Sequence, residues 1–220
     1  MYFIHDYCSL LPDLNNFILS FIPSITYFIS AKFYSHFHKE IKSPADESIS
    51  NSTKNMISTV PGNIFIVYPL FNYFSSIEGI YFMNIILSVF IIDTVEYFCH
   101  YLYHRISFFY NNIHNVHHKP VTVSPLTSFT NHDREALLTS SIILLFLVYS
   151  ALTFYEYIIA VCLSFSSTVC DHTSTSKKKF HYIHHHVNKN KNFQQPFFTY
   201  WDHIFGTYYK GSELKIPFVP

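Results

Sequence analysis

Apolar residues are concentrated in four stretches of the chain, each of which is interrupted by Ser, Asn or Tyr. These stretches cover residues 14–34, 64–74, 79–98 and 137–169. A helix needs about 20 apolar residues to cross a bilayer, so the first stretch fits one crossing, with Pro23 as an expected kink. The last stretch, with 33 residues, is long for one crossing and short for two full ones. We expect residues 64–98 and 137–169 to form two helical hairpins.

Polar residues separate the first two apolar stretches. The segment SPADESISNSTKNMISTVPGN, residues 43–63, contains turn formers and shows no helical periodicity, so we expect a linker there. The segment STSKKK, residues 174–179, is expected to be a second, shorter connector. We therefore divide the chain into an N-terminal membrane segment with its linker, residues 1–63, and a membrane domain, residues 64–220.

The positive charges indicate how the helices cross the membrane. All fourteen Lys and Arg lie in three segments, residues 32–54, 105–134 and 177–215. With both hairpins formed, all three segments face one side, and the opposite side carries no Lys or Arg. Cytosolic loops of membrane proteins are enriched in Lys and Arg, so we expect a multi-pass protein whose basic side faces the cytosol.

The composition is typical of a membrane protein and argues against several classes of function. Hydrophobic residues make up 49% and charged residues 13%, against roughly 25% charged residues in soluble domains. Fourteen basic residues balance fourteen acidic ones, which argues against a nucleic-acid partner. Only four Gly are present and no phosphate-binding Gly motif occurs, which argues against a nucleotide-binding loop. The four Cys form no C-x-x-C pair, which argues against a disulfide scaffold and a structural zinc site. The fold class that we expect is all-α, an integral membrane helical bundle with a cytosolic histidine-rich cap.

Histidine is the unusual component of this chain. Twelve of the fifteen His lie between residues 100 and 203. The first cluster, HYLYH, places His100 and His104 four residues apart on one face of the expected helix. Asp93 lies on the same face of this helix. A carboxylate at that position could orient a metal-binding imidazole by bonding the second nitrogen of the ring. Taken alone, the pattern also suits a His and an Asp that are hydrogen-bonded inside a membrane bundle.

Two further clusters repeat the pattern H-x-x-H-H. They are HNVHH, with His114, His117 and His118, and HYIHH, with His181, His184 and His185. On one helical turn this spacing directs two imidazoles together, with a third nearby. His172 follows the second hairpin and is expected to join them, although a helix end also suits a structural His. His186 is expected to point away from the face of His181.

Nine imidazoles exceed the four ligands of one tetrahedral ion and suit two metal ions with open positions. Imidazole binds iron, zinc and copper, so the ligands alone leave the metal open. A site at the cytosolic ends of membrane helices suits attack on the unactivated C–H bonds of a lipid. That reaction requires activated dioxygen, which favours redox-active iron over zinc.

The order H-x-x-x-H, H-x-x-H-H, H-x-x-H-H resembles the fatty acid hydroxylase superfamily, which includes sterol desaturases, sterol methyl oxidases and sphingolipid hydroxylases. The resemblance runs from Asp93 to Tyr209. Within it, NFQQPFFTYWDHIFGTYY, residues 192–209, is similar to the segment after the last His cluster in sphingoid base C4-hydroxylases. DTVEYFCHYLYH and VCDH resemble the same subfamily. Asp133 departs from the pattern, because the family usually has Pro at this position.

The resemblance implies a four-helix membrane protein of the endoplasmic reticulum with a cytosolic di-iron site. Asp93, Gln195 and Asp202 are the expected partners of ligating imidazoles, and His132, His186 and His203 are expected to bind no metal. The implied metal ligands are His100, His104, His114, His117, His118, His172, His181, His184 and His185. Such an enzyme uses O2, with electrons from NAD(P)H through a separate cytochrome b5 and its reductase. Its substrate would be a membrane lipid, hydroxylated at C4 of sphinganine or dihydroceramide in sphingolipid biosynthesis.

Two alternatives remain open at this point. A sterol desaturase or C4-methyl sterol oxidase would share the His site and bind a rigid polycycle. A His-rich metal transporter, or a non-catalytic metal-binding membrane protein, is expected to place its ligands inside the spans near the middle of the bilayer. The His clusters of this chain lie at or beyond the predicted helix ends, which favours the enzyme.

Overall fold

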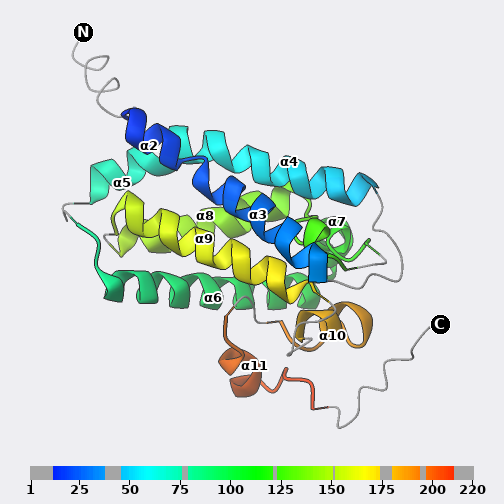
Figure 1. Cartoon of the computed structure of the whole chain (residues 1–220). Coiled ribbons are helices and arrows are strands. Elements are labelled where there is room, and N and C mark those ends of the chain that lie inside the picture. The colour runs from blue at the N-terminus through cyan, green and yellow to red at the C-terminus, as the bar shows by residue number, and fades with distance from the viewer. Residues whose placement is uncertain are drawn as a thin grey trace.

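All regular elements in the described part of the chain are helices, as the sequence predicted (Figure 1). The computed structural model describes residues 12–37, 46–75, 79–120, 123–150, 152–173, 180–193 and 197–210. The connector predicted at residues 174–179 lies outside these residues. The longer helices run side by side, and the short helices α7 (Ser107–Asn112) and α10 (Phe180–His186) lie at one end of the bundle (Figure 1).

The first apolar stretch forms two helices. α2 (Leu14–Leu19) ends in a turn at Ser20 and Phe21, and α3 (Ile22–Phe37) begins directly after this turn. Pro23 is the second residue of α3, where a backbone N–H would have no partner within the helix. The first apolar stretch is therefore interrupted shortly before Pro23.

The linker predicted over residues 43–63 is wrong for the described part of that range. α4 (Asp46–Gly62) continues through a π-helical turn, η1 (Asn63–Val67), into α5 (Tyr68–Phe74). The buried positions of α4 follow the spacing of one helical face: Ser48, Ser52, Asn55 and Met56. Because three of these four residues are polar, the helical period is absent from the pattern of apolar residues.

The buried polar face of α4 bonds the main chain of the loop that carries η3 (Pro125–Thr127). Ser52 Oγ accepts from the backbone N–H of Phe129 at 3.1 Å. Asn55 Nδ2 donates to the carbonyl oxygens of Phe129, at 2.8 Å, and Asn131, at 3.2 Å. Buried backbone groups need such partners, and small polar side chains supply them here. These bonds fix α4 against the loop that follows the second His cluster.

The second predicted hairpin is present, and its turn lies against the start of α6 (Phe82–Arg105). The 33-residue apolar stretch is divided between α8 (Asp133–Tyr149) and α9 (Phe154–Asp171). A capping box begins α9, in which the side chains of Thr153 and Glu156 each bond the other's backbone N–H. Glu156 Oε1 also accepts from the backbone N–H of Tyr81 at 2.7 Å, which ties the start of α6 to this turn.

The segments that carry the His clusters lie at the opposite end of the bundle from the α8–α9 turn (Figure 1). α6 and α9 end there and α8 begins there, beside α7, η2 (His114–Val116) and α10. Between the two ends, α5, α6, α8 and α9 contribute to the main apolar core, which includes Phe71, Ile92, Leu147, Leu152 and Ile158. The expectation that the His-rich segments share one side agrees with this arrangement.

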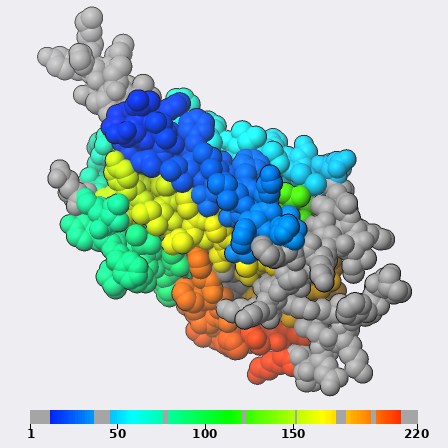
Figure 2. Space-filling model, viewed as in Figure 1, coloured from blue at the N-terminus to red at the C-terminus, as the bar shows by residue number. Residues whose placement is uncertain are grey.

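Among the described residues, two stretches are long and apolar enough to cross a membrane, Leu14–His36 and Phe82–Arg105. Apolar side chains are exposed along both of them, including Ile29 and Phe33 on α3 and Phe90 on α6. α3, α9 and α6 lie next to one another on the face seen in Figure 2. Exposed apolar surface on this scale is typical of contact with lipid or with another protein.

Candidate metal centre

Nine His from four segments of the chain meet at the end of the bundle. Their nitrogens form two groups, and in each group the ligand atoms lie within 4.8 Å of one another. The five-His group contains His100, His104, His114, His118 and His184. The four-His group contains His117, His172, His181 and His185. The structure therefore brings together all nine His that the sequence singled out.

Each H-x-x-H-H cluster is divided between the two groups. His114 and His118, four residues apart, belong to the five-His group, whereas His117 belongs to the four-His group. In α10 the assignment is reversed, because His181 and His185 serve the four-His group and His184 serves the five-His group. In both clusters, the two His that lie four residues apart join the same group, and the His between them joins the other.

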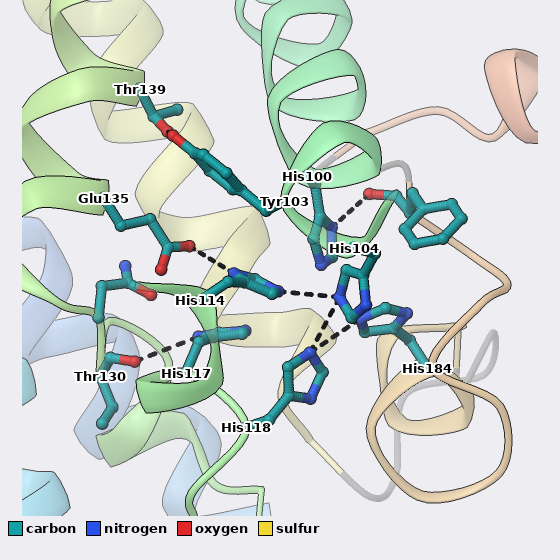
Figure 3. Close-up of polar contacts among 12 residues, drawn as sticks. His100, Tyr103, His104, His114, His117, His118, Thr130, Glu135, Thr139 and His184 are labelled. Atoms are coloured by element: carbon teal, nitrogen blue, oxygen red, sulfur yellow. Dashed lines mark hydrogen bonds and ion pairs between the residues drawn. The ribbon is translucent and has the colours of Figure 1, made fainter. Parts of the chain in front are cut away.

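In the five-His group, ring nitrogens face one another at short distances (Figure 3). His104 Nε2 lies 2.9 Å from His114 Nε2 and 3.1 Å from His118 Nε2. His184 Nε2 lies 3.3 Å from His118 Nε2. A ring nitrogen carries either one proton or one in-plane lone pair, so His104 Nε2 cannot form good hydrogen bonds with both neighbours. The contacts suit lone pairs that converge on one cation.

The four-His group repeats this arrangement. His185 Nε2 lies 3.0 Å from His117 Nε2 and 2.9 Å from His181 Nε2, and the latter two atoms are 3.3 Å apart. The ring of His172 lies 4.3 Å from that of His181, centroid to centroid. Three nitrogens in mutual contact cannot all be satisfied by hydrogen bonds among themselves. This group also has the donor set of a cation site.

Backbone carbonyl groups orient four of the nine imidazoles. The Nδ1 atoms lie 2.7 to 3.3 Å from carbonyl oxygens in the pairs His100–Phe193, His117–Thr130, His172–Thr168 and His184–Lys191. A carbonyl oxygen only accepts, so Nδ1 carries the proton and Nε2 of the neutral ring presents a lone pair. Nε2 of His100 and of His172 is buried without a hydrogen-bond partner in the described part of the chain. Buried lone pairs of this kind fit a metal ion in each group.

Burial keeps these imidazoles neutral. It lowers the pKa of His117 to about 4, and burial with the neighbouring His117 lowers the pKa of His172 to about 3. Burial and the surrounding imidazoles hold the pKa of His184 and His185 well below the ordinary value. A metal ion binds neutral imidazole, so these nitrogens are available near neutral pH without loss of a proton.

Glu135, in the first turn of α8, was not among the residues that the sequence analysis predicted to serve the site. Its Oε1 lies 2.7 Å from Nδ1 of His114, and both side chains are buried (Figure 3). A carboxylate on the second ring nitrogen fixes the orientation of a ligating imidazole and makes the imidazole a stronger ligand. The signal in the sequence is an acidic residue early in the helix after the second His cluster. An acidic residue at a helix N-terminus is also favoured by the helix dipole alone, so that signal is unspecific.

Asp93, one of the expected partners of the imidazoles, contacts the chain segment beside α6. Its Oδ1 accepts from the backbone N–H of Phe197 at 2.8 Å. Asp93 precedes His100 by seven residues, a rise of about 10.5 Å along the helix axis, so its carboxylate reaches the C-terminal segment. Gln195, the second expected partner, lies outside the described residues.

Asp202 supports the site through a backbone group. It is fully buried, and its Oδ1 accepts from the backbone N–H of Phe193 at 3.0 Å and from Thr207 Oγ1 at 2.6 Å. The carbonyl oxygen of Phe193 in turn accepts from Nδ1 of His100 at 2.8 Å. Asp202 therefore holds the residue whose carbonyl group orients His100.

The three His that were expected to bind no metal lie outside both groups. His132 is the N-cap of α8. His186 packs its ring on Tyr182 at 4.3 Å between centroids, and His203 packs on Tyr208 at 4.1 Å. His186 therefore faces away from the metal-ligand face of α10, in accordance with the helical register.

A cavity of about 90 Å³ lies beside both His groups, inside the bundle between α6, α8 and α9. Its lining includes His100, His114 and His117, which come from both groups. Glu96, Tyr103, Glu135, Thr139 and Ser164 form other parts of the wall. A small reacting group placed in this cavity would touch both candidate metal sites.

Comparison with known proteins identifies relatives of this chain. Residues 85–207 match the family model described as fatty acid hydroxylase. Sphinganine C4-monooxygenase 2 of Arabidopsis thaliana is 32% identical over 145 residues, which are 59% of this chain and 56% of that protein. A sphingolipid C4-hydroxylase of Schizosaccharomyces pombe is 33% identical over 157 residues, 64% of this chain and 49% of that protein. A very-long-chain aldehyde decarbonylase of Oryza sativa subsp. indica is 29% identical over 138 residues, 56% of this chain and 53% of that protein.

These comparisons also define the extent of the similarity. The chain spans about half the length of the curated relatives that it matches. No solved structure matches it significantly. The match to the family model covers more than half of the chain and includes all nine His of the two groups. The chain therefore belongs to the fatty acid hydroxylase family.

Proposed function

We propose that this chain is a membrane-bound di-iron monooxygenase that hydroxylates a long-chain lipid at C4 of sphinganine or dihydroceramide. The observation that carries the proposal is the division of nine imidazoles into two groups beside one cavity. Family membership supports an oxidative reaction on a fatty chain. The names of two relatives, sphinganine C4-monooxygenase and sphingolipid C4-hydroxylase, support the target carbon.

Iron held by the two groups would supply the activation of dioxygen that attack on an unactivated C–H bond requires. The protein contributes placement and the exclusion of water. Bonds from Nδ1 to carbonyl oxygens hold the rings of His100 and His184 with their Nε2 atoms turned inward. Phe193, which is 0% exposed, packs on the rings of His100, His104 and His184 and keeps water from that side of the five-His group.

We place the bundle in the membrane of the endoplasmic reticulum, with the His end in the cytosol. Two candidate spans, the exposed apolar side chains and the absence of Lys and Arg from residues 55–104 and 135–176 support this placement. In this orientation, a separate cytochrome b5 and its reductase would deliver electrons from NAD(P)H on the cytosolic side. The fatty chain would enter sideways from the bilayer.

Lipid profiling in cells that lack C4-hydroxylation tests the proposal. Expression of the chain should raise 4-hydroxylated long-chain bases at the expense of the dihydro forms. A double variant, His104→Ala with His185→Ala, should give no product at equal expression. Purified protein should require the separate reductase chain, and full turnover with NADH alone would contradict the proposed electron source.

Other lipid profiles would identify a different function. A change in sterol intermediates without a change in long-chain bases would indicate a sterol oxidase that uses the same His site. Consumption of very-long-chain aldehydes would indicate the reaction for which the rice relative is named. Bound metal without any change in lipids would indicate a non-catalytic metal-binding protein.

A further inference from the structure

Two acidic residues line the cavity beside the His groups. Glu96 on α6 and Glu135 on α8 both line it, together with the hydroxyl groups of Tyr103, Thr139 and Ser164. The described residues of the lining include no Lys or Arg. Neither Glu belongs to either His group. Two acidic side chains therefore share a small cavity in which no described basic residue balances them.

One of these carboxylates has an oxygen free for a ligand. Oε1 of Glu135 bonds His114, whereas Oε2 is buried and has no hydrogen-bond partner in the described part of the chain. The whole residue is only 7% exposed. A buried carboxylate oxygen without a donor is energetically costly, and a donor that enters the cavity would remove this cost. The second carboxylate, Glu96, makes a positively charged donor the most favourable one.

We propose that this cavity binds the free amino group of a long-chain base, with Glu96 and Glu135 as its counter-charges. The inference rests on the proposed function and specifies its substrate as the amino base in preference to the N-acyl form. The nitrogen of an N-acyl lipid is neutral, so it would leave both carboxylates without a counter-charge. The hydroxyl groups in the lining suit the alcohol groups that accompany the amine in such a base.

The location of the cavity agrees with hydroxylation at C4. The amino group of a long-chain base is on C2, so C4 is three bonds away, roughly 4 Å in an extended chain. The cavity wall contains His100 and His114 of the five-His group and His117 of the four-His group. A nitrogen held by the two carboxylates therefore places C4 beside both candidate metal sites. A cavity of about 90 Å³ accommodates a small polar head.

Binding measurements on the purified, metal-loaded full chain test the inference. The wild-type protein should bind sphinganine about tenfold or more tightly than N-acetylsphinganine, because the neutral amide leaves buried carboxylates without a partner, and loss of one partner of a buried charge pair weakens binding by at least about this factor. Glu96→Gln should remove the preference and leave the binding of N-acetylsphinganine unchanged. Glu47→Gln removes the same charge from an exposed position on α4 and should keep the wild-type preference. Glu96 is the better test position, because Glu135 also touches His114.

Three results would overturn the inference. They are equal binding of both lipids by the wild type, a preference that survives in Glu96→Gln, and loss of bound metal in Glu96→Gln. The first comparison uses the wild type alone, so it does not depend on the folding of a variant. Product analysis separates the inference from the proposed function. C4-hydroxylation without a preference for the amine refutes the inference alone, whereas a preference for the amine without hydroxylated product refutes the function.

Discussion

His114 and Glu135 are 21 residues apart in the sequence, and their Nδ1 and Oε1 atoms lie 2.7 Å apart in the buried end of the bundle. The bond joins the segment of the second His cluster to the first turn of α8. The orientation of one ring in the five-His group therefore depends on the position of a helix that contributes no His to either group.

Glu135→Gln should weaken metal binding in the five-His group. The variant keeps the shape of the side chain and removes its negative charge, and loss of such a partner typically lowers metal affinity by about 10- to 100-fold. The four-His group should keep its wild-type affinity, because Glu135 bonds none of its members in the contacts described above. Metal titration of the purified protein measures both affinities, with Glu47→Gln as the control. Identical titrations for Glu135→Gln and the wild type would contradict the role of this bond.

Substitutions in α10 should weaken one metal site at a time. His184→Ala affects the five-His group and His185→Ala the four-His group, so each should lower the metal bound by its own group and abolish product. His186→Ala is the matched control, because its ring packs on Tyr182 outside both groups. Elemental analysis and product formation at equal expression check this prediction. Equal damage from His186→Ala would mean that His186 serves the site.

Asp202→Ala should destabilise the protein and disturb the five-His group. The substitution leaves the buried backbone N–H of Phe193 and the hydroxyl of Thr207 without their acceptor, at a cost of about 1–3 kcal/mol. Movement of Phe193 should also release Nδ1 of His100 and lower the metal affinity. His203→Ala, at the exposed neighbouring position, should leave both quantities unchanged. Thermal unfolding and metal titration test the pair, and equal behaviour of the two variants would contradict the prediction.

The metal-free protein should lose stability as the pH falls from about 6.5 toward 4. Burial lowers the pKa of His117 to about 4 and that of His172 to about 3 in the folded chain, below the ordinary value of 6.5. In this interval the unfolded chain binds protons that the folded chain does not, so the free energy of unfolding decreases on acidification. Denaturant unfolding in detergent at pH 7 and pH 5 measures the change. A free energy that is constant or larger at pH 5 would contradict it.

The orientation in the membrane can be tested with two exposed positions at opposite ends of the bundle. In a chain without its own Cys, Ser50→Cys on α4 should react with an impermeant thiol reagent in intact microsomes. Tyr149→Cys at the α8–α9 turn, 89% exposed, should react only after the membrane is opened. The native sequon Asn51-Ser52-Thr53 should also carry no glycan, because the oligosaccharide is added on the lumenal side. The reverse labelling pattern would contradict the cytosolic placement of the His groups.

The sequence predicted the nine His and their meeting at one end of the bundle, because short-range spacing and helix ends fix both properties. It did not predict which His join which group. His117 and His118 are adjacent, yet they serve different groups, and this depends on how four distant segments pack together. Glu135 was missed for the same reason, since its partner His114 lies on another element.

α4 was missed because its buried face is polar. Ser52 and Asn55 are buried and bond the backbone of residues 129 and 131. The apolar residues of this segment therefore do not repeat with the period of a helix. The periodicity of apolar residues detects helix faces that bury apolar side chains. A helix whose buried face bonds main-chain groups can be predicted only when the loop on which it packs is known. The bond from Phe197 to Asp93 was not predicted for a similar reason, because Phe197 lies on a distant segment of the chain.

The bonds from Nδ1 to backbone oxygens affect how the site tolerates mutation. Phe193, Thr130, Thr168 and Lys191 each orient a His ring through an atom that every amino acid possesses. Ring orientation is therefore determined by the path of the chain. A side chain that does not itself pack on a His ring, such as that of Lys191, is free to change wherever that path is preserved, whereas the side chain of Phe193 packs on three of the rings. A saturation library at residue 191 should accept many side chains, whereas one at residue 135, where the orienting atom belongs to the side chain, should accept few.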